Sequence, residues 1–278
     1  MPALAIPHPF LSDTRSIPRF RDNYGSGWCV EAHGKSLVVR DAFGAAIPGA
    51  GVGCAIAKPM LARFGEEPFA RQSLTEDYEL GLRVAELGGR GRFLRCRMQD
   101  GRLVATRAFF PSRIGAAVRQ KTRWMHGIAL QGWDRLGWRG SAADIWMQLR
   151  DRRGPLAAIL LTLAYTLVVM SAGLWGFVSM GLVQPPQYSP VFEVLLAVNF
   201  IGLIWRFAMR GLFTAREFGW REGLRAMPRL FVSNIIAIMA ARRALQAYVG
   251  TLKGAPVIWD KTEHRDHPAL SPMHELAA

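Results

Sequence analysis

Thr75-Glu76-Asp77 places a hydroxyl and two carboxyl groups at the start of a predicted helix. Acidic side chains in the first turn of a helix are stabilised by the helix dipole. Ser73 lies three residues before Glu76, which is the spacing of a capping box, so the triplet taken alone is best interpreted as a structural cap. A chemical role for these carboxylates needs support from a second motif.

Gln120, Arg123 and Trp124 form such a motif inside a long predicted helix. At about 100° per residue they fall at about 0°, 300° and 40°, so they share one face. A forked guanidinium suits a diphosphate, and an indole ring offers a surface on which a sugar can stack. The same face could equally belong to an interfacial helix whose arginine contacts phospholipid.

The elements that position the first motif have an α/β pattern. Leu37–Val39 predicts a strand, and Met60–Phe64 predicts a short helix that begins near a proline. An amphipathic helix is predicted over 74–87, where Gly88-Gly89 ends it. The second motif needs a longer helix, which the sequence predicts over 113–136.

Two further strands are predicted at 93–98 and 103–108, because they flank the hairpin signal Gln99-Asp100-Gly101. Together with the helices they predict an α/β fold for the first 154 residues. The Trp-rich amphipathic stretch at 139–154 is predicted to lie on a membrane surface.

The remaining chain contains three apolar runs. Residues 156–183 carry no charge and exceed the ~20 residues needed to cross a bilayer core. A second span is predicted at 190–206. The run at 230–241 is too short to cross before Arg242, so an interfacial or re-entrant helix is expected there. The membrane region is thus predicted over 155–250.

Arginines gather on one side of these spans, while the connector at 184–190 has no Lys or Arg. The flanking arginines are Arg150, Arg152, Arg153, Arg206, Arg210, Arg216, Arg221, Arg225 and Arg229. The positive-inside rule then places residues 1–154 and 206–229 in the cytoplasm, with 251–278 as a cytoplasmic tail. We expect a multi-pass protein of the bacterial inner membrane, with membrane lipid as a partner.

Composition narrows the function classes. The 278 residues are 50% hydrophobic and carry a formal net charge of +14, but no nucleic-acid-binding motif accompanies that charge. The basic residues border apolar runs, which argues against nucleic acid as a partner. Cys29, Cys54 and Cys96 show no zinc-ligand spacing, and no metal-binding residue is predicted.

The two motifs, their order and the spans that follow resemble the processive-type family 2 glycosyltransferases, of which cellulose synthase is the familiar member. The match is closer still to the family of the bacteriophage N4 adsorption protein B. Stretches at 48–54, 73–88, 104–112, 116–140 and 259–264 carry the resemblance. It implies a GT-A fold that transfers sugar with inversion from a nucleotide-sugar donor to a glycan or lipid-linked acceptor.

The resemblance also implies roles for individual residues. Asp77 would be the general base, and Gln120 and Arg123 would bind the leaving diphosphate of the donor. The acceptor side of the site would comprise Trp124, Glu76, Gly51, Gly53 and Cys54.

One feature of the family is absent from the sequence. The family implies Mg²⁺ or Mn²⁺ held by a D-x-D pair, and no such pair occurs in this chain. We therefore expect residues 1–138 to form only the C-terminal part of a GT-A domain, inactive unless a separate chain supplies the N-terminal half. The alternative is a non-catalytic membrane scaffold or phage-adsorption component.

Overall fold

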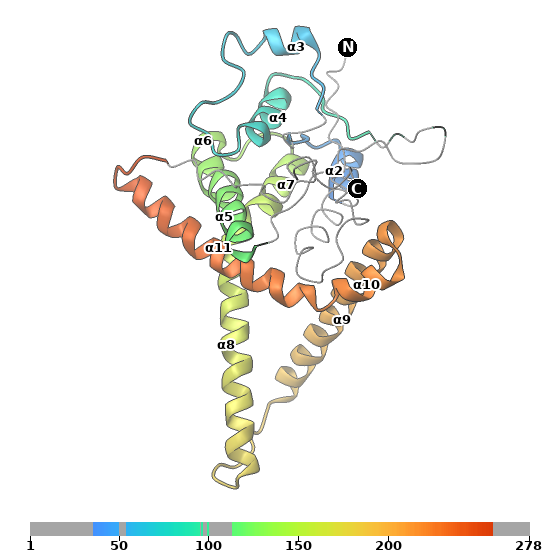
Figure 1. Ribbon diagram of the computed structural model, residues 1–278, viewed down its shortest axis with the longest axis vertical. Coiled ribbons are helices and arrows are strands. Elements are labelled where there is room, and N and C mark those ends of the chain that lie inside the picture. Colours follow the sequence, from blue (N-terminus) through green and yellow to red (C-terminus); the bar gives the residue numbers. More distant parts are fainter. Residues whose placement is uncertain (1–35, 50–53, 95, 97–98, 100–112, 258–278) are drawn as a thin grey trace, which may run out of the picture.

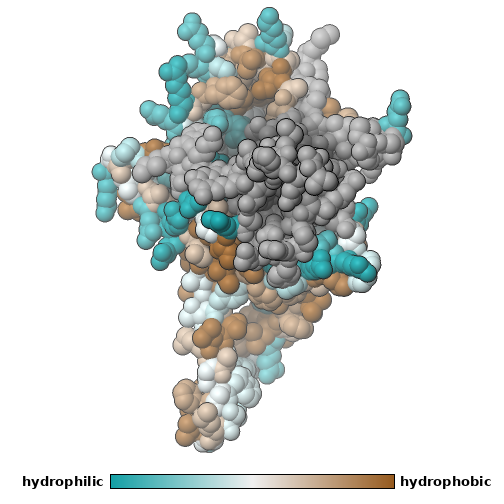
Figure 2. Space-filling view, viewed as in Figure 1, coloured by the Kyte–Doolittle hydropathy of each residue, from teal (hydrophilic) through white to brown (hydrophobic). Residues whose placement is uncertain are grey.

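The computed structural model describes residues 36–49, 54–94, 96, 99 and 113–257. These residues form a helical head above two long diverging helices, α8 and α9 (Figure 1). Apolar side chains cover much of the surface of the two long helices, whereas hydrophilic side chains project around the head (Figure 2). Within the described ranges no β-strand is formed, so the α/β class is not confirmed.

The predicted strand at Leu37–Val39 is wrong, because these residues open the helix α2 (Leu37–Ala42). The helical turn carries Arg40 into the protein, where its guanidinium donates to the Ala46 carbonyl and to Asp151. In the region of the predicted hairpin, Phe93 and Leu94 have no regular structure. Most of that hairpin lies outside the described residues.

The two short helices of the head follow the sequence pattern. α3 (Lys58–Ala62) begins with a proline in its first turn, as predicted. α4 (Glu76–Glu86) confirms the helix expected over 74–87, and Gly88 follows its end with φ +77°. α3 packs on α4 through Met60 and Val84.

The helix predicted over 113–136 is a continuous rod with a π-helical centre. Its parts are α5 (Ile114–Met125), the π-helix η4 (His126–Gln131) and α6 (Gly132–Leu136). Leu136 packs with Tyr78 and Leu82 of α4, which places the end of the rod on the helix that carries the first motif.

α7 (Ala142–Arg152) lies within the stretch predicted at 139–154 and has a capping box formed by Ser141 and Asp144. Its inner face buries Met147, Gln148 and Arg152. Its outer face exposes apolar residues that include Trp146. That amphipathic pattern agrees with the prediction, and contact with a membrane surface stays a prediction.

Within the part of the chain that the structure describes, three helices are long and apolar enough to cross a membrane, by length and composition. The first, α8 (Gly154–Ser179), confirms the predicted apolar helix. α9 (Pro190–Phe218) runs twelve residues beyond the predicted end at 206, with its span candidate ending at Arg216. It continues because Arg210 is buried, donating to the Ala226 carbonyl of α10 (Trp220–Ala226) and to Ser233.

The third helix, α11 (Arg229–Leu252), is twice as long as the run predicted at 230–241. Arg242 and Arg243 do not end it, because both lie on its exposed side while Ala241 and Ala244 are buried. α11 runs across the top of α8 instead of alongside it (Figure 1). Its Ile236 and Ala240 pack against Val118 of α5, so α11 forms a floor under the rod. The domain boundaries proposed from the sequence remain predictions.

Candidate active site

Asp77 occupies the first turn of α4, beside Glu76, and both side chains are half-buried. The capping box predicted from Ser73 and Glu76 is not formed: the N-cap is Thr75, without a side-chain cap hydrogen bond. The Ser73 hydroxyl accepts instead from the Thr75 backbone N–H at 3.3 Å. The side chains of Thr75, Glu76 and Asp77 therefore do not form the predicted helix cap.

Burial raises the pKa of Asp77 above its ordinary value. The backbone N–H of Tyr78, which donates to Asp77 Oδ1 at 2.8 Å, opposes that shift, Glu76 adds to it, and Arg123 lowers the pKa. The influence of Arg123 means that the fold brings the two motifs into electrostatic range. A carboxylate with a raised pKa is a stronger base, as general-base catalysis near neutral pH requires.

The second motif lies on α5. Gln120, Arg123 and Trp124 are all half-buried, so each combines a packed part with an accessible part. α5 contacts α11, since the Thr122 hydroxyl of α5 lies 3.4 Å from the Ala240 carbonyl of α11. At the end of α5, Met125 packs against Gly154, where α8 begins. The second motif therefore lies close to the start of α8.

Of the acceptor-side residues predicted at 51–54, Cys54 is the one that lies within the described ranges. Cys54 is exposed, whereas Gly51 and Gly53 lie outside the described residues. Gly49, just before them, lies so close to α4 that a Cβ there would collide with the Asp77 carbonyl oxygen. The segment that leads to the predicted acceptor loop is therefore in direct contact with the first turn of α4.

Sequence reasoning missed three side chains that join the rod to α4: Gln131, Arg135 and Glu79. Gln131 bonds the backbone on either side of Ser73, and Arg135 forms an ion pair with Glu79. The available signal was their spacing, since Gln131 and Arg135 are one turn apart and follow the second motif on the same predicted helix.

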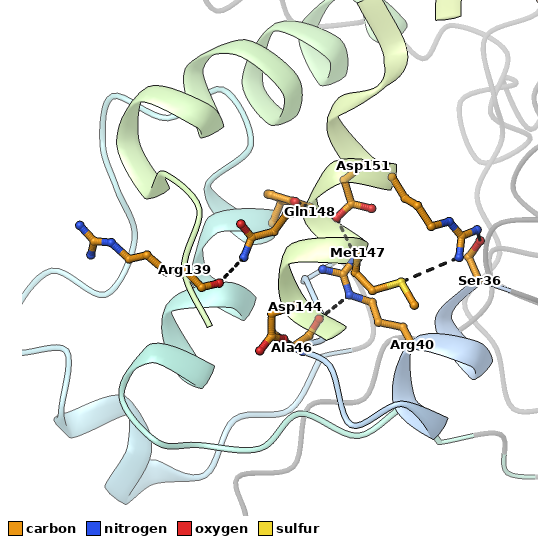
Figure 3. Close-up of polar contacts among 10 residues, drawn as sticks. Ser36, Arg40, Ala46, Arg139, Asp144, Met147, Gln148 and Asp151 are labelled. Atoms are coloured by element: carbon orange, nitrogen blue, oxygen red, sulfur yellow. Dashed lines mark hydrogen bonds and ion pairs between the residues drawn. The ribbon is translucent and has the colours of Figure 1, made fainter. Parts of the chain in front are cut away.

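A second group of polar contacts includes Tyr78 of α4. Asp151 accepts from Arg40 Nη1 at 2.7 Å, and Asp144 accepts from the Ala46 backbone N–H (Figure 3). Asp151 also accepts from the Tyr78 hydroxyl at 2.8 Å. Burial and then the charge of Asp151 raise the pKa of Tyr78, so the hydroxyl stays protonated and donates. This network joins α2, α4 and α7.

The described residues do not fit the family's divalent metal. No group of three His, Cys, Asp or Glu side chains within those ranges is placed to hold an ion. Asp77 lies within electrostatic range of Arg123, which supplies a positive charge to the site.

Comparisons with known proteins identify the family of the chain. The family model for "Glycosyl transferase family group 2" matches residues 14–213, so the chain belongs to that family of glycosyltransferases. Two relatives from Escherichia coli are each 32% identical over 273 residues: "Bacteriophage adsorption protein B" of strain K12 and "Bacteriophage N4 adsorption protein B" of O157:H7. Each alignment covers 87% of this chain and 36% of the relative, so the chain spans about a third of their length.

Proposed function

We propose that the protein is a membrane-bound inverting glycosyltransferase that moves a sugar from a nucleotide-sugar donor to a glycan or lipid-linked acceptor. The observation that supports this most is the half-buried carboxyl group of Asp77, with its raised pKa, held in range of Arg123. Family membership supplies the reaction class. The alternative, a non-catalytic adsorption component, is favoured by the names of the two relatives.

In the proposed reaction the Asp77 carboxylate takes the proton of an acceptor hydroxyl. The hydroxyl oxygen then attacks the anomeric carbon of the donor sugar from the face opposite the diphosphate. The bond from that carbon to the phosphate oxygen breaks, and its electron pair leaves with the nucleoside diphosphate. Arg123 and Gln120 stabilise the departing charge, because hydrogen bonds to charged groups are worth about 1.5–3 kcal/mol each.

Trp124 is proposed to stack on the acceptor sugar, since an indole ring combines apolar area with a polar edge. Glu76, Gly51, Gly53 and Cys54 are proposed to line the acceptor side. We further propose that the donor base and its metal are held by residues outside this chain, because the sequence has no D-x-D pair.

This division of the site predicts weak donor binding by the isolated chain. Gln120 and Arg123 alone supply a few kcal/mol, which corresponds to dissociation constants of about 1 mM or weaker. Calorimetric titration with UDP and GDP plus Mg²⁺ or Mn²⁺ checks this, first with the purified chain and then after addition of the remaining part of a full-length relative. Micromolar binding by the chain alone would refute the division, and no gain on addition would favour the scaffold.

The proposed membrane topology predicts on which side of the membrane a reporter protein lies when it is fused at a given position. Arginine asymmetry places the head and the α9–α10 turn in the cytoplasm of a bacterial inner membrane. Fusions after Gln187 and after Gly219 are expected on opposite sides. A third fusion after Gly254 is expected on the side of Gly219, because α11 runs across α8 and packs under the head. Placement of the Gly254 fusion with Gln187 would make α11 a third span.

A further inference from the structure

The side-chain amide of Gln131 on the rod forms two hydrogen bonds with the backbone that precedes α4. Its Oε1 accepts from the Leu74 backbone N–H at 3.0 Å, and its Nε2 donates to the Gln72 carbonyl at 2.8 Å. One side chain thus satisfies a donor and an acceptor of the backbone that leads into Thr75. Because both bonds go to main chain, they define the position of that segment and not merely its contact partner.

The ion pair between Arg135 and Glu79 is a second contact of this kind. It lies one turn after Gln131 on the rod and joins the rod to the first turn of α4. Arg135 Nε lies 2.9 Å from Glu79 Oε2, and Nη2 lies 3.2 Å from Oε1. Such two-point pairing restricts orientation as well as distance. Only 8% of the Glu79 side chain is exposed, so this pair is screened less by water than a surface pair.

One turn before Gln131, the rod closely approaches the segment that leads into α4, where the atoms nearest to Gly127 belong to the side chains of Thr75 and Leu74. A Cβ at Gly127 would stand 2.6 Å from Thr75 Oγ1, so only glycine allows this contact without displacement. Gly127 belongs to η4, whose π-helical turn holds more residues than an α-helical turn. The wider turn brings Gln131 nearer to the face of Arg123 than α-helical periodicity would place it.

We infer that Gln131 and Arg135 are positioning residues, which hold the first turn of α4 against the rod and so set the placement of Asp77 relative to Arg123. The inference rests on the role proposed for Asp77. The amide of Gln131 and the guanidinium of Arg135 both bond the segment around the start of α4. Both lie on the rod that carries Arg123, and both contact the segment that carries Asp77.

Contacts that do not involve Gln131 or Arg135 also hold the rod in place. Arg152 of α7 donates to the Gly137 carbonyl at 2.6 Å and to the Gly132 carbonyl at 3.2 Å, which fixes α6. The Tyr248 hydroxyl of α11 donates to Asp134 at 2.8 Å. Loss of Gln131 and Arg135 should therefore loosen α4 from a rod that stays in place.

The test measures the coupling between Arg123 and Asp77 without any substrate. The full chain in lipid nanodiscs is treated with a water-soluble carbodiimide and an amine over a pH series. Fragment-ion mass spectrometry separates labelling of Asp77 from that of Glu76. Carbodiimide reacts with the protonated carboxyl group, so the midpoint of labelling reports the pKa of Asp77. Arg123→Gln is made in the native background and in Gln131→Leu/Arg135→Met.

In the native background Arg123→Gln should raise the midpoint, since a nearby cation favours the carboxylate. In the double variant the same substitution should raise it by less than about a third of that amount, because Arg123 no longer lies at its native distance. An equal shift in both backgrounds overturns the inference. Where the double variant does not insert, Gln131→Asn and Arg135→Lys serve, and an intermediate loss of coupling is expected.

The matched control is Arg63→Met at the opposite end of the same helix, where Arg63 Nη1 donates to the Leu87 carbonyl at 2.7 Å. It removes an arginine contact with α4 but none near Asp77, so the Arg123→Gln shift should be unchanged. A loss of coupling in this control would mean that general loosening of α4 suffices. Sugar transfer is not part of the measurement, so the inference and the proposed activity can fail separately.

Discussion

Asp77→Asn is expected to lower sugar transfer by about 10²–10⁴-fold in the full-length protein or in an assembly that restores transfer. Asparagine keeps the shape of the side chain but cannot take the proton of the acceptor hydroxyl. The measurement is release of nucleoside diphosphate from a panel of UDP- and GDP-sugars by membranes that contain the protein. A variant that keeps more than about a tenth of the activity would rule out Asp77 as the general base.

The control for this variant is Glu86→Gln, which removes an exposed carboxylate at the far end of α4 and should leave transfer unchanged. Stability provides a second control. Burial raises the folded-state pKa of Asp77, so ionisation costs the folded state free energy as pH rises from the ordinary value through that raised pKa. Asp77→Asn should therefore be at least as stable as the native protein at neutral pH, and the two should converge in acid. Lost activity then cannot be attributed to misfolding.

Local patterns predicted the helices well where a single physical signal dominated. The charge-free run that became α8 is the plainest example, because no soluble element needs such length. The helix of Asp77 was also found, since its apolar spacing and the glycines after it agree. The end of α9 was missed because the arginines from Arg206 onward suggest a membrane boundary, whereas Arg210 bonds to α10 and α11.

The failures arise where tertiary contacts decide. Val38 and Val39 favour a strand locally, but the burial of Arg40 against Asp151, 111 positions away, accompanies a helix. The contacts of Gln131 with the backbone around Ser73 are of the same kind, since they join residues nearly sixty positions apart. The motifs themselves could be found from spacing. The residues that orient them could not, because a lone sequence does not reveal which distant backbone they meet.

Asp151→Ala is expected to destabilise the head by about 3 kcal/mol, because it leaves a buried arginine without its carboxylate. Only 4% of the Arg40 side chain is exposed, and its Nη1 lies 2.7 Å from Asp151 Oδ2. The matched control is Glu67→Ala, which breaks the ion pair with Arg71, whose side chain is 80% exposed. That exposed pair should contribute less than about 1 kcal/mol. Thermal and denaturant unfolding in nanodiscs compare the two variants.

Replacing both partners separates the cost of the unpaired charge from loss of packing. Arg40→Met with Asp151→Leu substitutes apolar groups of similar length, so most of the stability should return. The Tyr78 hydroxyl also donates to Asp151, and Tyr78 directly follows Asp77. Asp151 in turn lies just before Gly154, where α8 begins. Transfer should therefore stay reduced in the stabilised double variant, because the restored packing does not restore the link between the first membrane helix and the turn that carries the base. Full recovery of transfer would show that this link matters for stability alone.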